Sequence, residues 1–170
     1  MFNNIQVPRE VGFVLSIDPA TKAGFALFDL KTHELIDTLT VCCDPKSTWG
    51  TRVNYIMSEV REYFKEYIPD IKYIIFESNK TSSALLNGLA VSVMGVAPLA
   101  KVSDALCGVS PSSWKAWVRR ESGLPIAKPK GLEALALVRP EYVEMCDSED
   151  SADACLIALW WLNTKKPKNW

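Results

Sequence analysis

LSIDPATKAGFALF, residues Leu15–Phe28, holds two apolar runs on either side of a short polar turn. The first run belongs to Val11–Asp18, which is almost continuously apolar and ends in an Asp-Pro pair. The second run, Ala23–Phe28, follows directly after the turn. Short apolar runs bounded by turn residues predict buried strands. A looser alternation at Glu34–Val41 predicts a third strand, and the short connections between all three indicate an antiparallel meander.

After the meander, the hydrophobic pattern alternates between helix and strand. Apolar residues recur at helical spacing from Ser47 to Tyr67, and Pro69-Asp70 is expected to end that helix. Ile71–Glu77 predicts a buried strand, and Leu99–Val102 a fifth one. Further helices are expected at Thr81–Met94, Pro111–Glu121, Gly131–Val138 and Ser148–Asn163. This order predicts an α/β fold: a mixed five-stranded sheet, made of the antiparallel meander plus two parallel strands, flanked by helices.

The bulk composition is that of an ordinary soluble domain. A chain of 170 residues with 48% hydrophobic and 23% charged residues suits a single domain, residues 1–170, with residues 1–10 and 164–170 as flexible tails. No apolar run is long enough to cross a bilayer, and the N-terminal residues do not form a secretory signal. We therefore expect a cytoplasmic protein, in a bacterium or a phage-infected host, with no membrane partner.

Cysteine and histidine usage argues against two classes of site. The five cysteines include no Cys-x-x-Cys pair, and His33 is the only histidine. A zinc centre needs a tight cluster of nitrogen or sulfur ligands, and a hydrolytic triad needs a well-placed histidine. Both are therefore poorly supported, and the cysteines are interpreted as ordinary thiols.

The net charge of −1 does not indicate a nucleic-acid binder, but the distribution of charge is uneven. Residues 101–139 carry seven basic and three acidic residues, whereas residues 141–153 carry six acidic residues and no basic one. A basic stretch beside an acidic cluster suits a phosphate-binding surface next to a cation site. Two ordinary solvated faces would give the same pattern, so the asymmetry decides nothing by itself.

Four acidic residues stand where predicted strands end or the last helix begins. Asp18 ends the first strand and Glu77 the fourth, and the carboxyl ends of parallel neighbours meet at one edge of a sheet. Asp150 and Asp153 are three residues apart and share a helix face. Each acid alone is also typical of a turn or a solvated helix start. Together they form an oxygen-only ligand set suited to Mg²⁺ or Mn²⁺, and two such ions about 3.5–4 Å apart can hydrolyse a phosphodiester.

Three motifs, in the same order and at similar separations, resemble those of RuvC-like Holliday junction resolvases. They are LSIDPATKAGFALF at Leu15–Phe28, YIIFE at Tyr73–Glu77 and DSADACLIAL at Asp150–Leu159. The resemblance covers about residues 11–163, and the first and last motifs are the specific ones. It implies a ribonuclease H-like fold, a homodimer, and paired nicks across a four-way DNA junction.

The resemblance also implies residue roles. Asp18 resembles the acid that bridges two Mg²⁺ ions (Mn²⁺ substituting), Glu77 and Asp153 resemble further metal ligands, and Asp150 resembles the remaining acid of the set. The family has a lysine near the scissile phosphate, for which Lys130 is the candidate and Lys128 the alternate. The residues expected to contact DNA are Lys80, Lys115, Arg119, Arg120, Lys128 and Lys130.

Two departures from the family pattern bear on the substrate. Ala20 replaces the glycine that usually follows Asp-Pro, and no aromatic residue follows Glu77, where Ser78, Asn79 and Lys80 stand. The second departure weakens the expectation of base stacking at the junction centre and of a cleavage-sequence preference. The divergence is consistent with a phage or other viral member that also cuts forks or flaps.

Two further segments have more than one interpretation. In SPSSWKAWVRR, residues 110–120, Trp114 and Trp117 are three apart on a predicted helix, which favours core packing over base stacking. Trp160 and Trp161 are likewise expected in the core or beside the dimer interface. The small-residue apolar helix Thr81–Met94 is our expectation for the interface itself, since a two-fold dimer would place two sites on a two-fold-like junction.

Three alternatives stay open from the sequence. The first is a ribonuclease H-like nuclease that acts on RNA or RNA–DNA hybrids, and the second is a protein that binds junctions without cutting them. The third is an actin-like phosphotransferase, whose first phosphate loop also follows a strand aspartate. The chain is short for that two-lobed fold and lacks its glycine-rich loops.

Overall fold

The computed structural model describes residues 12–19, 22–78, 106–124 and 130–165. Within them a five-stranded sheet has the order β3-β2-β1-β4-β5. Strand β1 pairs antiparallel with β2, and β2 with β3, while β1 pairs parallel with β4 and β4 with β5. The predicted mixed sheet is therefore confirmed. The strands are β1 (Phe13–Asp18), β2 (Lys22–Asp29), β3 (Leu35–Cys42), β4 (Ile71–Glu77) and β5 (Leu106–Val109).

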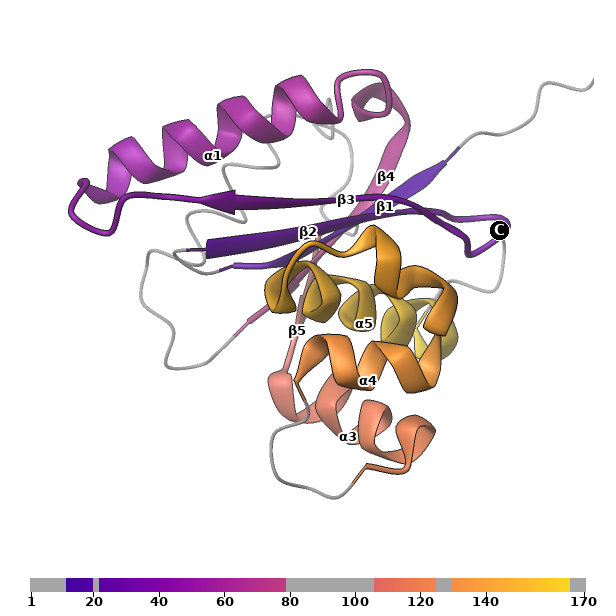
Figure 1. Ribbon diagram of the computed structural model, residues 1–170. Helices are drawn as coiled ribbons and strands as arrows, with labels where there is room; N and C mark the ends of the chain where they lie inside the picture. The colour runs from indigo at the N-terminus through magenta and orange to yellow at the C-terminus, as the bar shows by residue number, and fades with distance from the viewer. Residues whose placement is uncertain (1–11, 20–21, 79–105, 125–129, 166–170) are drawn as a thin grey trace, which may run out of the picture.

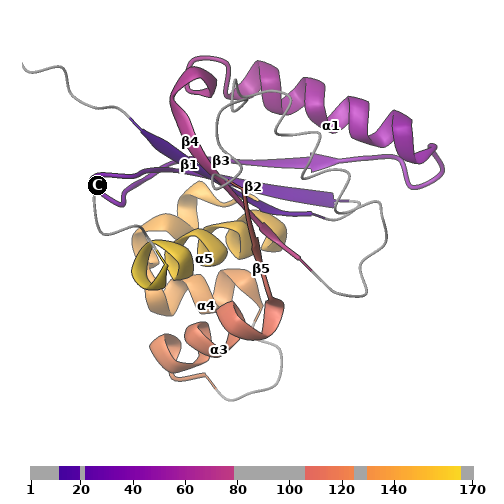
Figure 2. The same ribbon diagram turned by 180° about the vertical axis from the view of Figure 1, so that it is seen from behind.

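Helices cover the two faces of the sheet unequally (Figures 1 and 2). One face carries α1 (Trp49–Tyr63), and the other carries α5 (Glu149–Thr164), which packs on β1 and β2. Two more helices, α3 (Pro111–Ser122) and α4 (Gly131–Val138), pack against α5. Two hydrophobic cores result, one on each side of the sheet.

The alternation of side chains along β1 decides which face each residue meets. Phe13, Leu15 and Ile17 enter the core beneath α1, whereas Val14 enters the core beneath α5. Because successive strand side chains point to opposite faces, Ser16 and Asp18 share the α5 face with Val14. The first catalytic candidate therefore lies on the side of the sheet where α5 begins.

The start of α5 is fixed by hydrogen bonds. Ser148 caps the helix: its hydroxyl accepts from the Ser151 backbone N–H at 3.1 Å, and the Ser151 hydroxyl accepts from the Ser148 N–H at 3.2 Å. Such reciprocal capping satisfies N–H groups that the helix itself cannot pair. The Thr40 hydroxyl of β3 lies 2.7 Å from the Ser148 hydroxyl, which ties the cap to the sheet.

One predicted boundary is wrong, and one strand was not predicted. Helix α1 ends at Tyr63 rather than near Tyr67. The chain continues in turns, with a hydrogen bond from the Tyr67 N–H to the Phe64 carbonyl, and residues Ile68–Asp70 form a short 3₁₀ helix. The apolar spacing continued through this stretch because Phe64 still packs in the core. The strand that pairs with β4 is Leu106–Val109, which the sequence did not predict, because LCGV has too few strongly β-forming residues to stand out. The predicted strand Leu99–Val102 lies outside the described residues.

Several other expectations concern segments at the edges of the described residues or beyond them. The expected helix Thr81–Met94 and residues 99–102 lie outside the described residues, as do residues 1–11 and 166–170. Helix α5 continues to Thr164, one residue into the expected C-terminal tail. None of the helices that the structure describes combines the length and the apolarity that a bilayer span requires.

Candidate active site

Asp18 and Glu77 lie side by side at the ends of two parallel strands. In the β1–β4 pairing Ile17 faces Phe76, so the next residues along both strands are Asp18 and Glu77. Tyr73 and Ile75 of β4 belong to the core beneath α5, and the two-residue repeat of a strand places Glu77 on that same face. The sheet therefore brings these two predicted acids together, beneath the helix that carries the other two.

A glycine lets the start of α5 lie directly on the sheet. Gly24 faces Asp18 in the β1–β2 pairing. A Cβ placed on Gly24 would stand only 2.0 Å from the backbone oxygen of Asp150 and 2.6 Å from the nitrogen of Ser151. No other residue leaves room for so close an approach. The glycine of the first motif thus positions Asp150 above the end of β1.

A second glycine brings the start of α4 to the same place. A Cβ on Gly131 would meet Asp153 Oδ1 at 2.6 Å and the backbone oxygen of Glu149 at 2.7 Å. Glu149 Oε2 also accepts a hydrogen bond from the backbone N–H of Leu132 at 3.0 Å. Glu149 was not among the predicted site residues, although its place beside Asp150 was a signal for it.

Burial and mutual repulsion raise the pKa of two of the acids. The pKa of Asp18 rises to about 7 because of burial first, then the charges of Asp153, Glu77 and Asp150, with Lys115 opposing. The pKa of Asp153 also rises to about 7: burial is the largest cause, Lys115 opposes it, and Glu77, Glu149 and Asp150 add to it. These mutual effects place the four predicted acids in one cluster, and its negative charge favours the binding of protons or cations.

Two residues of α3 contact the Glu77 carboxylate. The Trp114 indole N–H donates to Glu77 Oε2 at 2.8 Å, and Lys115 Nζ lies 3.7 Å from the same oxygen. The Lys115 ammonium also lies 4.8 Å from the centre of the Trp114 ring. The sequence predicted Lys115 as a DNA contact, and the structure places it beside the acids.

A second lysine lies on the other side of the cluster. Lys22 Nζ, at the start of β2, is 3.6 Å from Asp150 Oδ2. This lysine stands between Asp18 and Gly24 in the first motif, but it was not among the predicted site residues. Both this pair and the Lys115–Glu77 pair involve lysines that are 40–49% exposed, so they lie at the rim of the cluster.

The donor set fits a hard divalent cation. Carboxylate oxygens are the ligands that Mg²⁺ and Mn²⁺ prefer, and a cation would relieve the repulsion that raises the pKa of Asp18 and Asp153. Among the residues that the structure describes, no three Asp, Glu, His or Cys side chains already stand in metal-ligand positions. The side chains that contact these acids are Trp114 and Lys115 at Glu77 and Lys22 at Asp150.

The other predicted residues lie around this cluster or outside the described residues. Lys130 is exposed at the first residue before α4, next to Gly131. Arg119 is partly buried one helical turn after Lys115, and exposed Arg120 pairs with Glu121 at 3.0 Å. Lys80 and Lys128 lie outside the described residues. The predicted burial of Trp114 and Trp117 is confirmed, and Trp161 is buried with Trp160 packed against the same core.

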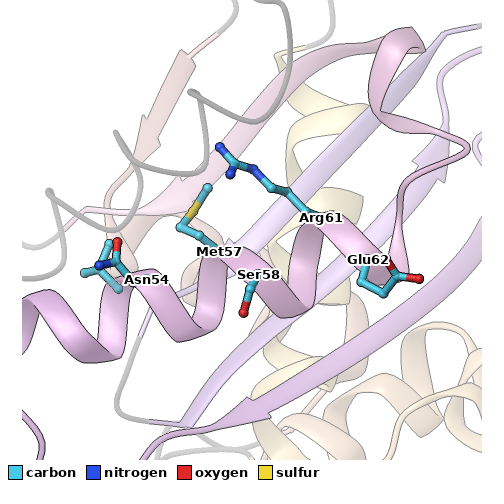
Figure 3. Close-up of a pocket in the computed structure, with 6 residues that line it drawn as sticks. Asn54, Met57, Ser58, Arg61 and Glu62 are labelled. Carbon is cyan, nitrogen blue, oxygen red and sulfur yellow. The ribbon is translucent and has the colours of Figure 1, made fainter.

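A hollow beside α1 is remote from the acids. It is lined by Val53, Asn54, Met57, Ser58, Arg61 and Glu62, all of them from α1 (Figure 3). Helix α1 covers the opposite face of the sheet from α5 (Figure 2). The hollow therefore does not belong to the carboxylate cluster.

Known structures share this architecture. No protein-family model and no curated protein matches the chain. Thermus thermophilus RuvC in complex with Holliday junction substrate matches with a TM-score of 0.58 at 18% identity, over 91% of this chain and 96% of that one. A second Thermus thermophilus RuvC structure matches with a TM-score of 0.59 at 19% identity, over 89% and 95% of the two chains. The chain therefore has the RuvC-like form of the ribonuclease H fold.

Proposed function

We propose that this chain is a metal-dependent endonuclease that resolves four-way DNA junctions by paired nicks. The observation that carries the proposal is the carboxylate cluster of Asp18, Glu77, Asp150 and Asp153, in which Asp18 and Asp153 have a pKa near 7. A second support is the fold shared with a RuvC structure that was solved with a Holliday junction substrate. Forks or flaps are further substrates in this proposal.

The four acids would hold the metal ions. Two Mg²⁺ ions, or Mn²⁺ in their place, would supply Lewis-acid activation of a water and stabilisation of the leaving oxygen. The chain itself presents carboxylates on rigid elements: Asp18 and Glu77 on strand ends, Asp150 and Asp153 on a capped helix. Partial burial keeps competing water away and strengthens the attraction of these acids for cations.

Basic residues around the cluster would bind the DNA backbone. Lys115 and Arg119 are four residues apart on α3 and so share a helix face, which begins beside the acids. Lys130 is proposed to contact the scissile phosphate, because its neighbour Gly131 packs against Asp153. Arg120 and the two predicted lysines outside the described residues, Lys80 and Lys128, complete the proposed set. A homodimer would place two such sites on the two-fold-like junction.

The decisive experiment is cleavage of a synthetic four-way junction by the purified protein with Mg²⁺, with a linear duplex of the same sequence as control. We expect paired nicks in opposite strands of the junction and little cutting of the duplex. Asp18→Asn should abolish cleavage and leave junction binding largely intact. Absence of cleavage with both Mg²⁺ and Mn²⁺ would refute the proposal.

Side-by-side substrates separate this function from its alternatives. Junction, flap and RNA–DNA hybrid substrates are compared under the same conditions. Efficient cutting of the hybrid with no cutting of the junction would identify a ribonuclease instead. Tight junction binding without cleavage by any metal would identify a binding protein.

A further inference from the structure

The buried indole of Trp114 uses a carboxylate of the acidic cluster as its hydrogen-bond acceptor. Trp114 is only 2% exposed, and its Nε1 lies 2.8 Å from Glu77 Oε2. A buried tryptophan N–H needs an acceptor, and a charged acceptor makes a shorter and stronger bond than a neutral one. Core packing, which the sequence predicted for Trp114, therefore accounts for its ring but not for the direction of its N–H.

The backbone fixes Trp114 and Glu77 relative to each other. Glu77 faces Val109 in the β4–β5 pairing, and the Ser78 N–H donates to the Val109 carbonyl at 2.8 Å. The next residue, Ser110, is the N-cap of α3, whose first turn is stiffened by Pro111. Trp114 thus lies in the first turns of a helix that directly follows β5, the strand paired with the end of β4.

The ring of Trp114 is also held by its surroundings. It belongs to the core beneath α5, together with Trp117 and Val118 of the same helix. A packed aromatic side chain cannot follow a carboxylate that rotates away. Lys115 lies 3.7 Å from the same Glu77 oxygen, but its side chain is 40% exposed and long, so it neutralises charge without fixing an orientation.

We propose that Trp114 is a positioning residue for Glu77. Its N–H holds the Glu77 carboxylate in one orientation within the acidic cluster, so that the carboxylate is preorganised for a divalent cation. This inference rests on the proposed function, in which Glu77 is a metal ligand. It adds a residue that the chain supplies from α3 and that no acidic motif contains.

The first test observes the hydrogen bond directly, without any reaction. In the full chain labelled with ¹⁵N-tryptophan, Trp114→Phe identifies the Trp114 indole signal by its disappearance. We expect that signal to move in Glu77→Ala and, to a smaller degree, in Glu77→Gln, which keeps an acceptor oxygen. It should also move on addition of Mg²⁺ alone, whereas the Trp117 signal, identified with Trp117→Phe, should move much less. A Trp114 signal that responds neither to the Glu77 variants nor to Mg²⁺ would overturn the inference.

The second test separates positioning from packing. Trp114→Phe and Trp117→Phe make the same change at two buried sites of one helix, but only the first removes the N–H that reaches Glu77. Loss of a group that orients a metal ligand costs about 10–100-fold in metal affinity or activity. We therefore expect Trp114→Phe to raise the Mg²⁺ concentration for half-maximal junction cleavage about tenfold or more, with Trp117→Phe close to wild type.

Equal effects of the two variants on the Mg²⁺ requirement would reduce Trp114 to a packing role and overturn the inference. A wild-type protein that cuts no branched DNA would overturn the proposed function instead. The indole signals still decide the hydrogen bond in that case, because they need no turnover.

Discussion

Asp18 and Asp153 lower the stability of the folded protein when they are ionised. Each carboxyl is partly buried among other acids, and each has its pKa raised from 3.8 to about 7. The folded protein therefore holds these protons more tightly than the unfolded chain does. Stability from this source is fully present below the unfolded pKa and is lost as pH rises towards 7.

The first prediction concerns metal-free protein between pH 5 and 8. We expect its melting temperature to fall as pH rises through this window, because the folded state must then carry the ionised Asp18 and Asp153. Asp18→Asn, which removes one charge, should flatten the fall. We expect it to stabilise the protein at pH 8 by roughly 1–2 kcal/mol. In a chain of this size, each kcal/mol raises the melting temperature by about 2–4 °C. Calorimetry in EDTA measures both, and a steeper fall in the variant would contradict the assignment.

The second prediction concerns Mg²⁺ at the same residues. A cation that binds ionised carboxylates competes with protons, so its stabilising effect should grow with pH. We expect a saturating Mg²⁺ concentration to raise the melting temperature clearly at pH 8 and little at pH 5.5. Asp153→Asn should remove most of the gain at pH 8. An equal gain at both pH values, or an undiminished gain in the variant, would place the cation elsewhere.

At the scale of elements, the site depends on how closely the start of α5 approaches β2. Gly24 makes that approach possible, since a Cβ there would stand 2.0 Å from the Asp150 backbone oxygen. Backbone cannot move aside as a flexible side chain can. The arrangement of the acids is therefore built into the packing of a helix on a strand, and a small change there should reach all four of them.

The third prediction is that Gly24→Ala destabilises the protein by about 3 kcal/mol or more, at or above the usual range for overpacking. The matched control is Gly50→Ala in α1, where no heavy atom lies within 4 Å of the added Cβ. Alanine exceeds glycine in helix propensity by about 1 kcal/mol, so the control should be neutral or stabilising. Urea unfolding of both variants measures the difference. A near-neutral Gly24→Ala would mean that α5 does not lie on β2 as closely as this.

The fourth prediction belongs to α3. If Lys115 and Arg119 contact phosphates, each alanine substitution should weaken the binding of junctions of any base sequence. It should also reduce the magnitude of the slope of log K against log salt concentration by about 1. Lys65, which is exposed on the far side of the sheet and paired with Glu62 at 2.8 Å, provides the control substitution. Unchanged slopes in Lys115→Ala and Arg119→Ala would remove α3 from the DNA surface.

The elements also show what the sequence could predict. Strands β1 and β4 and helix α5 were predictable because their apolar runs are bounded by clear turn or cap residues, and the four acids stand at those boundaries. Strand β5 was not, because its four residues are held by pairing with β4 rather than by their own propensity. The contacts of Lys22 and Trp114 with the acids were also hidden, since they join residues far apart in the chain. Local patterns thus indicated the four acids, and only the packing revealed the residues that contact them.

At the scale of the whole molecule, paired cutting requires two sites. One chain holds a single carboxylate cluster in its described residues, so a junction with two equivalent strands calls for two copies related by a two-fold axis. In each copy, the α5 face of the sheet, which carries the acids with Lys22 and Lys115, would then contact one DNA strand of the junction. We expect the protein to sediment as a homodimer in the absence of DNA.

The fifth prediction tests that arrangement with mixed dimers. Wild type should convert a supercoiled plasmid with an extruded cruciform directly to linear DNA, because both nicks fall within one binding event. When wild type and Asp18→Asn are mixed in equal amounts and allowed to exchange, about half of the dimers carry one active site. Those dimers can cut only one strand, so nicked circles should accumulate at the expense of linear product. A mixture that only slows linear product, with no nicked circles, would show that each copy acts alone and that pairing of the nicks has another origin.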